Sequence, residues 1–231
     1  GYPRALRFDP AYAPLQAFFP GYPIVVRLLS PFGHPTATAV VISVIAGAIA
    51  AVLLWLVAQR LTNAATATTA TALFVFFPGS FVFGWTYSEG VMCALAAACC
   101  FFLVRRRPLA AAWYGAAATL VRPNALALVV AVGIATWTLG RGLRVVPRVA
   151  RSIGLAALTA SGFLAFQGYL WVHSGSPTTW WRAEHDYWRQ GGVPGYELYK
   201  VGIRPLFDHP GFIHVATFVF LLIAIGLTAV T

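Results

Sequence analysis

Five apolar runs dominate this chain and constrain its fold more than any other feature. They cover residues 37–59, 64–83, 90–104, 152–171 and 213–230. A helix needs about 20 apolar residues to cross the hydrocarbon core of a bilayer, a length that the longer runs reach and the shorter ones approach. Backbone groups inside a bilayer must pair with one another, and a helix pairs them locally. The runs therefore predict an all-α fold, a polytopic bundle of transmembrane helices that forms one transmembrane domain over residues 1–231.

The composition fits a surface that faces lipid. Hydrophobic residues make up 59% of the chain and charged residues 10%, and the mean hydropathy is +0.75. A soluble domain of 231 residues needs a more strongly charged surface than 16 basic and 6 acidic residues provide. The formal net charge of +10 does not indicate nucleic-acid binding, because the basic residues are scattered between the apolar runs and form no continuous stripe.

Both ends of the sequence suggest a piece of a longer protein. The chain begins with Gly1, its one methionine is Met92, and it stops at Thr231 directly after an apolar run. The first 36 residues do not have the charged segment and apolar core of a signal peptide. We therefore expect further sequence on the N-terminal side.

Two dense basic connections determine the expected orientation. Residues 105–107 are consecutive arginines, residues 141–151 carry another arginine cluster, and neither segment has an acidic residue. The positive-inside rule assigns both to the cytoplasm, so the chain must cross the membrane an even number of times between them. Residues 109–139 are too long for one ordinary span. Two short helices that meet at Arg122-Pro123 satisfy the rule, with the proline at the start of the second helix, where its missing N–H costs least.

This alternation brings two polar interruptions, Tyr87-Ser88-Glu89 and Arg122-Pro123-Asn124, to one extracytoplasmic face. Ionisable residues at membrane depth are costly and so point to a function. A purely structural role is also open for each interruption. Ser88 and Glu89 are typical of a helix start, and Arg122 is able to reach lipid headgroups or pair with an acidic neighbour.

Two further outer segments flank the bundle. Residues 1–36 are expected to form an outer loop, and residues 173–211 an outer loop with a short interfacial helix. The second segment mixes aromatic rings with both signs of charge between Trp180 and Arg189, which fits an interfacial anchor or a lid over a lipid-linked substrate.

A metal site is not expected. Glu184, His185 and Asp186 are consecutive, and on a helix such side chains point in different directions. The three cysteines lie within one apolar run and do not have the spacing of a zinc site or a disulfide framework.

The order of several short motifs resembles the PIG-V family of mannosyltransferases. The motifs are Gly1-Tyr2, AFFPGYP at residues 17–23, FPGS at residues 77–80, Tyr87-Ser88-Glu89 and LVRPN at residues 120–124. The resemblance covers residues 1–130, and residues 175–188 give a looser match. It implies an integral-membrane glycosyltransferase of the GT-C type that transfers mannose, with inversion, from a polyprenyl-phosphate donor to a glycan or glycolipid acceptor. The high Ala, Arg, Gly and Pro content suggests a GC-rich bacterium, and hence the extracytoplasmic face of a plasma membrane.

The resemblance also implies roles for residues of the outer face. Members of the family carry a Trp-Asp pair upstream of the Gly-Tyr motif, so the family's catalytic aspartate would precede Gly1, and Asp9 and Glu89 are the candidate catalytic carboxylates within this sequence. Inverting transfer needs a carboxylate to deprotonate the acceptor and a cation to stabilise the leaving phosphate. Arg122 suits the phosphate. The remaining donor-binding candidates are Tyr87, Ser88, Asn124, Tyr22 and Trp180. No cofactor or metal is expected, and the partners are membrane lipid and the two substrates.

Two other functions stay open. A transporter or lipid flippase also places charges at breaks in membrane helices, but it predicts inverted repeats, and the apolar runs show none. A non-catalytic scaffold subunit of a membrane assembly is the third interpretation, because the catalytic aspartate is expected outside this sequence.

Overall fold

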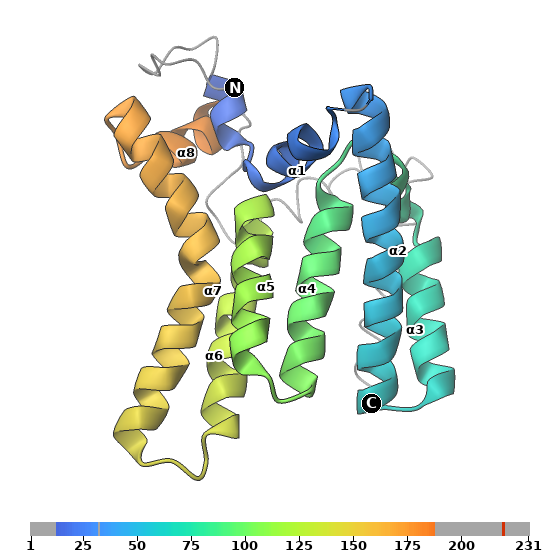
Figure 1. The fold of residues 1–231 in the computed structure, drawn as a ribbon, viewed down its shortest axis with the longest axis vertical. Helices are drawn as coiled ribbons and strands as arrows, with labels where there is room; N and C mark the ends of the chain where they lie inside the picture. The colour runs from blue at the N-terminus through green and yellow to red at the C-terminus, as the bar shows by residue number, and fades with distance from the viewer. Residues whose placement is uncertain (1–12, 32, 188–218, 220–231) are drawn as a thin grey trace.

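The computed structural model describes residues 13–31, 33–187 and 219, and this part of the chain is all-helical, with no strand. The longer helices are α1 (Gly21–Leu29), α2 (Pro35–Leu61), α3 (Ala64–Phe76), α4 (Glu89–Val104), α5 (Pro108–Val121), α6 (Ala127–Leu139) and α7 (Val145–Ser174). Short elements are η1 (Ala13–Ala17), η2 (Pro78–Gly84), η3 (Pro123–Leu126), α8 (Thr179–Arg182) and the π-helix η4 (Ala183–Tyr187). The helices α2 to α7 run side by side, and α1 and α8 lie across one end (Figure 1). The predicted all-α fold class is confirmed.

Two of these helices, α2 and α7, are long and apolar enough to cross a membrane. A third span exists if α3 and η2, which meet at a bend of 72°, are taken together. The remaining apolar helices α4, α5 and α6 are shorter. These lengths are compatible with a membrane protein. The apolar run at residues 213–230 lies outside the described residues.

Two of the apolar helices, α3 and α5, end two residues before a proline. Phe77 precedes Pro78 and Arg122 precedes Pro123, and both leave the helical region, with φ and ψ of −58° and 136° for Phe77 and −153° and 144° for Arg122. A proline ring clashes with a helical conformation of the residue before it. The predicted pair of short helices on either side of Arg122 is therefore present as α5 and α6. The expected helix over residues 64–83 instead ends at Phe76 and bends into η2.

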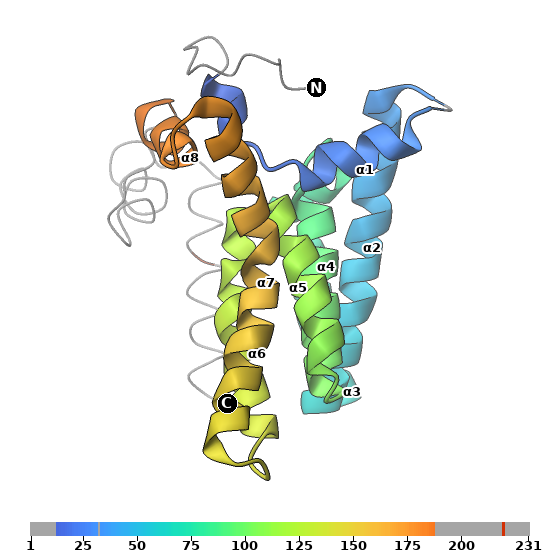
Figure 2. The ribbon, with the colours of Figure 1, turned by 60° about the vertical axis from the view of Figure 1, so that its left-hand side comes forward.

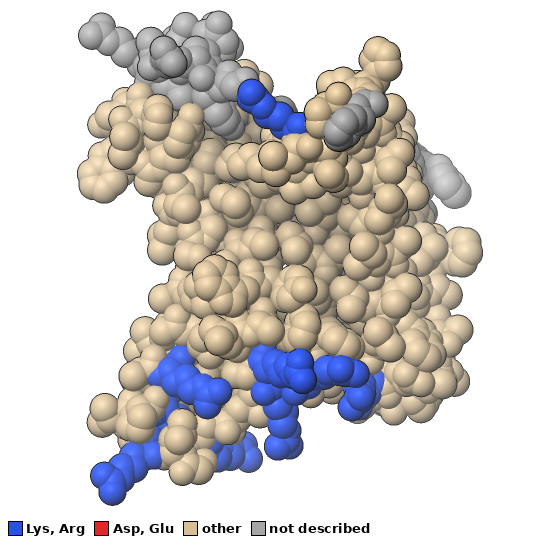
Figure 3. Space-filling model, viewed as in Figure 1, with Lys and Arg blue, Asp and Glu red and all other residues tan. Residues whose placement is uncertain are grey.

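The chain reverses direction between successive helices from α2 to α7, which separates its polar features into two ends (Figure 1). Arg60, residues 105–107 and residues 141–144 lie at one end, here called the arginine end, where most of the visible basic side chains gather (Figure 3). Residues 78–89 and 122–124 lie at the opposite end, together with η1, α1 and α8, in both views of the ribbon (Figures 1 and 2). The segment 1–36 was expected as an outer loop, but part of it is helical, because it contains η1 and α1. Pro23 lies in the first turn of α1, where proline is tolerated.

Small residues let the helices approach closely beneath this opposite end. A Cβ atom added to Gly162 of α7 would lie 2.0 Å from the carbonyl oxygen of Ala116 in α5, and one added to Gly90 of α4 would lie 2.7 Å from that of Ser43 in α2. Close packing of small residues is typical of helix pairs in membranes. Thr119 adds a polar contact, because its Oγ1 lies 2.9 Å from the carbonyl oxygen of Thr159. These contacts fix the ends of α4 and α5, which carry the two polar interruptions.

Candidate functional site

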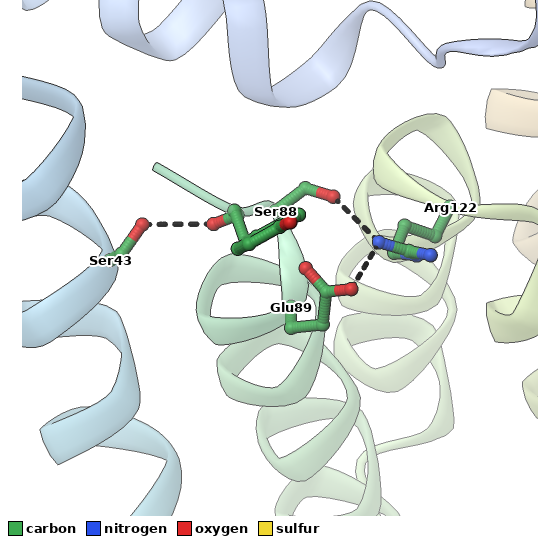
Figure 4. Close-up of polar contacts among 5 residues, drawn as sticks. Ser43, Ser88, Glu89 and Arg122 are labelled. Carbon is green, nitrogen blue, oxygen red and sulfur yellow. Dashed lines mark hydrogen bonds and ion pairs between the residues drawn. The ribbon is translucent and has the colours of Figure 1, made fainter. Parts of the chain in front are cut away.

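The two polar interruptions meet at the end of the helices opposite the arginine end. Nη1 of Arg122 donates to Oε1 of Glu89 at 2.6 Å and to Oγ of Ser88 at 3.2 Å (Figure 4). The side chains of Arg122 and Glu89 are 34% and 27% exposed, so the pair is partly withdrawn from solvent. We call Ser88, Glu89 and Arg122 the polar cluster.

Local structure explains how these three side chains reach one another. Glu89 is the first residue of α4, where a carboxylate is favoured by the positive end of the helix dipole. Arg122 follows the last residue of α5, where a cation is favoured by the negative end. Ser88 is the N-cap of α4 but makes no side-chain capping bond, and its hydroxyl accepts a hydrogen bond from Arg122. The side chain of Ser88 therefore does not have the capping role that its place before a helix suggested.

A buried hydroxyl pair supports the start of α4. Oγ of Ser43, which is fully buried in α2, donates to the backbone oxygen of Tyr87 at 2.8 Å (Figure 4). The hydroxyl of Tyr22 lies 3.0 Å from the same Ser43 Oγ and donates to the carbonyl oxygen of Ala39 at 2.9 Å. Tyr22 is itself buried, so these contacts make it a brace between α1 and α2 and leave its hydroxyl paired.

Several buried polar atoms near this end make no hydrogen bond to any described residue. They are Oε2 of Glu89, both amide atoms of Gln16 and Nε1 of Trp180. Gln16 is fully buried, and its element η1 packs against α8 and η4. Leaving buried polar groups unpaired costs free energy, so such groups indicate a missing ligand or water. Each of these atoms is covered by protein, so a bound molecule would pair it only after the surrounding side chains move aside.

Glu184 adds a second carboxylate to the surroundings of Arg122. Burial raises the pKa of the Glu184 carboxyl above its usual value of 4.5, and the positive charge of Arg122 opposes part of that rise. Glu184 therefore experiences the charge of Arg122 but forms no ion pair or hydrogen bond with it. Sequence reasoning considered Glu184 only as a metal ligand and missed this effect. Its place beside aromatic residues in an outer segment was the available signal.

The aromatic candidates form two separate groups. Tyr87 is exposed and stacks with Trp85, with ring centroids 6.4 Å apart. Trp180 stands edge-on to Phe19 and Phe163, at centroid distances of 6.1 and 5.6 Å. The rings at Trp180 therefore belong to the packed contact between the η1–α1 connection, α7 and α8, whereas Tyr87 faces outward.

The other predicted site residues do not join the polar cluster. Asn124 is exposed in η3, and its side chain makes no hydrogen bond to a residue that the structure describes. Asp9 lies outside the described residues. Within residues 13–31 and 33–187, His, Cys, Asp and Glu side chains form no group of three or more that could hold a metal ion.

Comparisons of the chain with protein-family models, with curated proteins and with solved structures find no match.

Proposed function

We propose that this chain belongs to a multi-pass membrane glycosyltransferase that transfers mannose, with inversion, from a polyprenyl-phosphate donor to a glycan or glycolipid acceptor. We further propose that the reaction takes place on the extracytoplasmic face of a bacterial plasma membrane. The observation that carries the proposal is the contact of Arg122 with Glu89 and Ser88 at the end of the helices away from the arginine end. The ordered motifs that resemble the PIG-V family also support the proposal. The comparisons with known proteins found no match and so do not test it.

Arg122 has the chemistry of a donor-phosphate ligand. Only its Nη1 is engaged, by Glu89 and Ser88, and its Nε and Nη2 have no hydrogen-bond partner among the described residues. A guanidinium presents its N–H groups in a planar fork that matches two phosphate oxygens. Negative charge accumulates on the phosphate as the sugar leaves, so an arginine held in place stabilises the transition state more than the bound donor.

Glu89 and Glu184 have different roles in this proposal. Glu89 gives one oxygen to Arg122 and so orients the guanidinium, while its buried Oε2 has no hydrogen-bond partner among the described residues. Glu184 has no ion pair among the described residues, and its raised pKa makes it a stronger base than an exposed carboxylate. It is the described carboxylate best suited to accept the proton of the acceptor hydroxyl.

Gln16 and Trp180 supply groups that a sugar ring would pair. The amide of Gln16 combines donor and acceptor capacity, and Nε1 of Trp180 is a donor; all of these atoms are buried and unpaired among the described residues. Sugar hydroxyls both donate and accept, which lets one ring satisfy several such groups. An apolar lipid chain alone would leave them unpaired, so they favour a lipid-linked sugar over a simple lipid as the substrate.

The test is a transfer assay with the full-length protein, including the sequence expected before Gly1, in liposomes supplied with labelled polyprenyl-phosphate mannose and a panel of glycan and glycolipid acceptors. Mannose transfer to an acceptor, with release of polyprenyl phosphate, is the expected result. Correctly folded protein that transfers no sugar from any donor would overturn the proposal. Movement of the labelled lipid between leaflets without transfer would then favour a flippase, and neither activity would favour a scaffold.

A further inference from the structure

The arginine end contains an open hollow that the proposed transfer reaction does not use. Its volume is about 370 Å³, and it is lined by Arg60, Val104, Arg105, Arg106 and Arg107. Arg60 belongs to the last turn of α2, Val104 is the last residue of α4, and the other three arginines form the connection to α5. The hollow therefore lies where the ends of adjacent helices meet.

Arg106 has a left-handed backbone conformation, which is strained for a residue with a side chain. Arg106 has φ of 57°, and it alone among the described non-glycine residues has a positive φ. The N–H of Arg106 bonds to Leu103 at 2.9 Å and that of Arg107 to Phe102 at 2.8 Å, which is the pairing of a Schellman motif at the end of α4. Glycine is the usual residue at the left-handed position of this motif, because it has no Cβ to clash. An arginine there accepts a backbone cost while adding a positive charge beside the hollow.

The positive charge around the hollow has no counter-charge in the described part of the chain. The ion pairs among described residues are Arg122 with Glu89 and His185 with Asp186, and both are at the opposite end. All four arginines of the hollow are exposed. Arg105 also packs over the ring of Phe101, at 4.7 Å from its centroid, which holds that side chain beside the hollow. Like charges gathered without an acid repel one another, and an anion would relieve that repulsion.

We propose that this hollow binds a phosphate-bearing anion, which in the membrane is the headgroup of an anionic phospholipid. Arginine side chains match phosphate oxygens geometrically, and an open, shallow hollow suits a headgroup that stays partly in the interface. Helix ends of a membrane protein lie at headgroup depth, where a basic pocket between helices attracts anionic lipid. The proposal depends on the membrane setting and is independent of the transferase activity.

A second group of arginines at the same end serves as a matched control. Arg148 already has partners, because its Nε donates to the backbone oxygen of Trp137 at 2.7 Å and its guanidinium packs over that ring. Arg141 and Arg144 are exposed and do not line the hollow. Removing these two charges changes the net charge of the arginine end as much as removing two charges from the hollow.

The experiment compares three variants of the full chain with the unaltered protein: R60Q/R106Q, R141Q/R144Q and Arg106→Gly. Each is purified in neutral detergent and titrated with cardiolipin, and bound lipid is counted by native mass spectrometry. R60Q/R106Q is expected to weaken cardiolipin binding about tenfold or more, whereas R141Q/R144Q binds as the unaltered protein does. Equal loss in both double variants, or no loss in either, would overturn the proposal.

Arg106→Gly keeps the result interpretable if the double variant folds poorly. Glycine adopts the left-handed conformation without strain, so this variant should melt at an equal or higher temperature in the absence of lipid, yet gain less stability from cardiolipin. An undiminished gain would contradict a role for the Arg106 side chain. A further titration uses inorganic phosphate as competitor. Displacement of cardiolipin at an equal concentration of phosphorus would contradict a lipid headgroup and identify free phosphate as the ligand.

Discussion

Arg122 and Glu89 are 33 residues apart in the chain, yet Nη1 of the arginine lies 2.6 Å from Oε1 of the glutamate. The pair joins the end of α5 to the start of α4, and neither side chain is more than about a third exposed. Partial burial reduces screening by water, so this contact has a larger effect than an ion pair on an open surface. It also leaves Oε2 of Glu89, and Nε and Nη2 of Arg122, without a hydrogen-bond partner among the described residues.

A double-mutant cycle should reveal this coupling. Glu89→Gln and Arg122→Gln each leave a partly buried charge without its partner, and we expect each to lower the free energy of unfolding by about 1–2 kcal/mol. The double variant should cost less than the sum, with a coupling energy of about 1 kcal/mol measured by unfolding in detergent micelles. Asp186→Asn, which disrupts the exposed His185–Asp186 contact, is the control and should change stability little. Strictly additive effects would show that the Arg122–Glu89 contact contributes nothing.

Replacing Gln16 with an apolar residue should raise stability and lower the rate of mannose transfer. Its amide is fully buried and makes no hydrogen bond to a described residue, so Gln16→Met removes an unpaired polar group at similar volume. We expect the free energy of unfolding to rise by about 1 kcal/mol while the rate of mannose transfer falls, because the amide is proposed to bind the sugar. Gln59→Met, at an exposed position of α2, should change neither quantity. A stabilised variant with normal transfer would remove Gln16 from the substrate site.

The pH dependence of transfer should reflect Glu184. Burial raises the pKa of its carboxyl above 4.5, so the group takes up its proton at a higher pH in the folded chain than in the unfolded chain. The protonated form favours folding, and this contribution is present at low pH and is lost as the pH rises through the raised pKa. A base must be ionised, so transfer should increase over that same interval. Glu184→Gln should abolish this acidic limb of the pH–rate profile, while Asp186→Asn should retain it. An unchanged limb in Glu184→Gln would contradict its role as the base.

Close packing between α5 and α7 should be sensitive to one methyl group. A Cβ on Gly162 would meet the carbonyl oxygen of Ala116 at 2.0 Å, whereas one on Gly168 of the same helix would meet nothing within 4 Å. We expect Gly162→Ala to lower the free energy of unfolding by about 1–3 kcal/mol through overpacking. Gly168→Ala should raise it by up to about 1 kcal/mol, because alanine favours the helix. Equal effects in thermal unfolding would contradict the close approach of the two helices.

The sequence predicted the features that depend on local patterns. The lengths of the apolar runs predicted that these segments are helical. The proline after Arg122 predicted the break between α5 and α6. The arginine connections predicted which segments share an end. The bend after Phe76 was missed, although Pro78 was its signal, because the apolar run continues through it.

Features that depend on side-chain contacts between distant segments could not be predicted in the same way. Gln16 lies in a short stretch without helical periodicity, and its burial arises only when η1 packs against α8 and η4. Ser88 looked like a helix cap, and only the approach of Arg122 from another helix redirects its hydroxyl. The effect of the Arg122 charge on Glu184 likewise depends on where the outer segment folds back.

The most direct test of the proposed phosphate role compares Arg122→Ala with Arg141→Ala in the full-length protein. Arg141 is an exposed arginine at the other end of the molecule, so its variant controls for loss of charge and for membrane insertion. The measured quantity is the initial rate of mannose transfer from polyprenyl-phosphate mannose in liposomes, at equal amounts of inserted protein. Arg122→Ala should lower this rate by about 100-fold or more, while Arg141→Ala stays near the unaltered rate. Transfer by Arg122→Ala at the rate of Arg141→Ala would contradict the central claim.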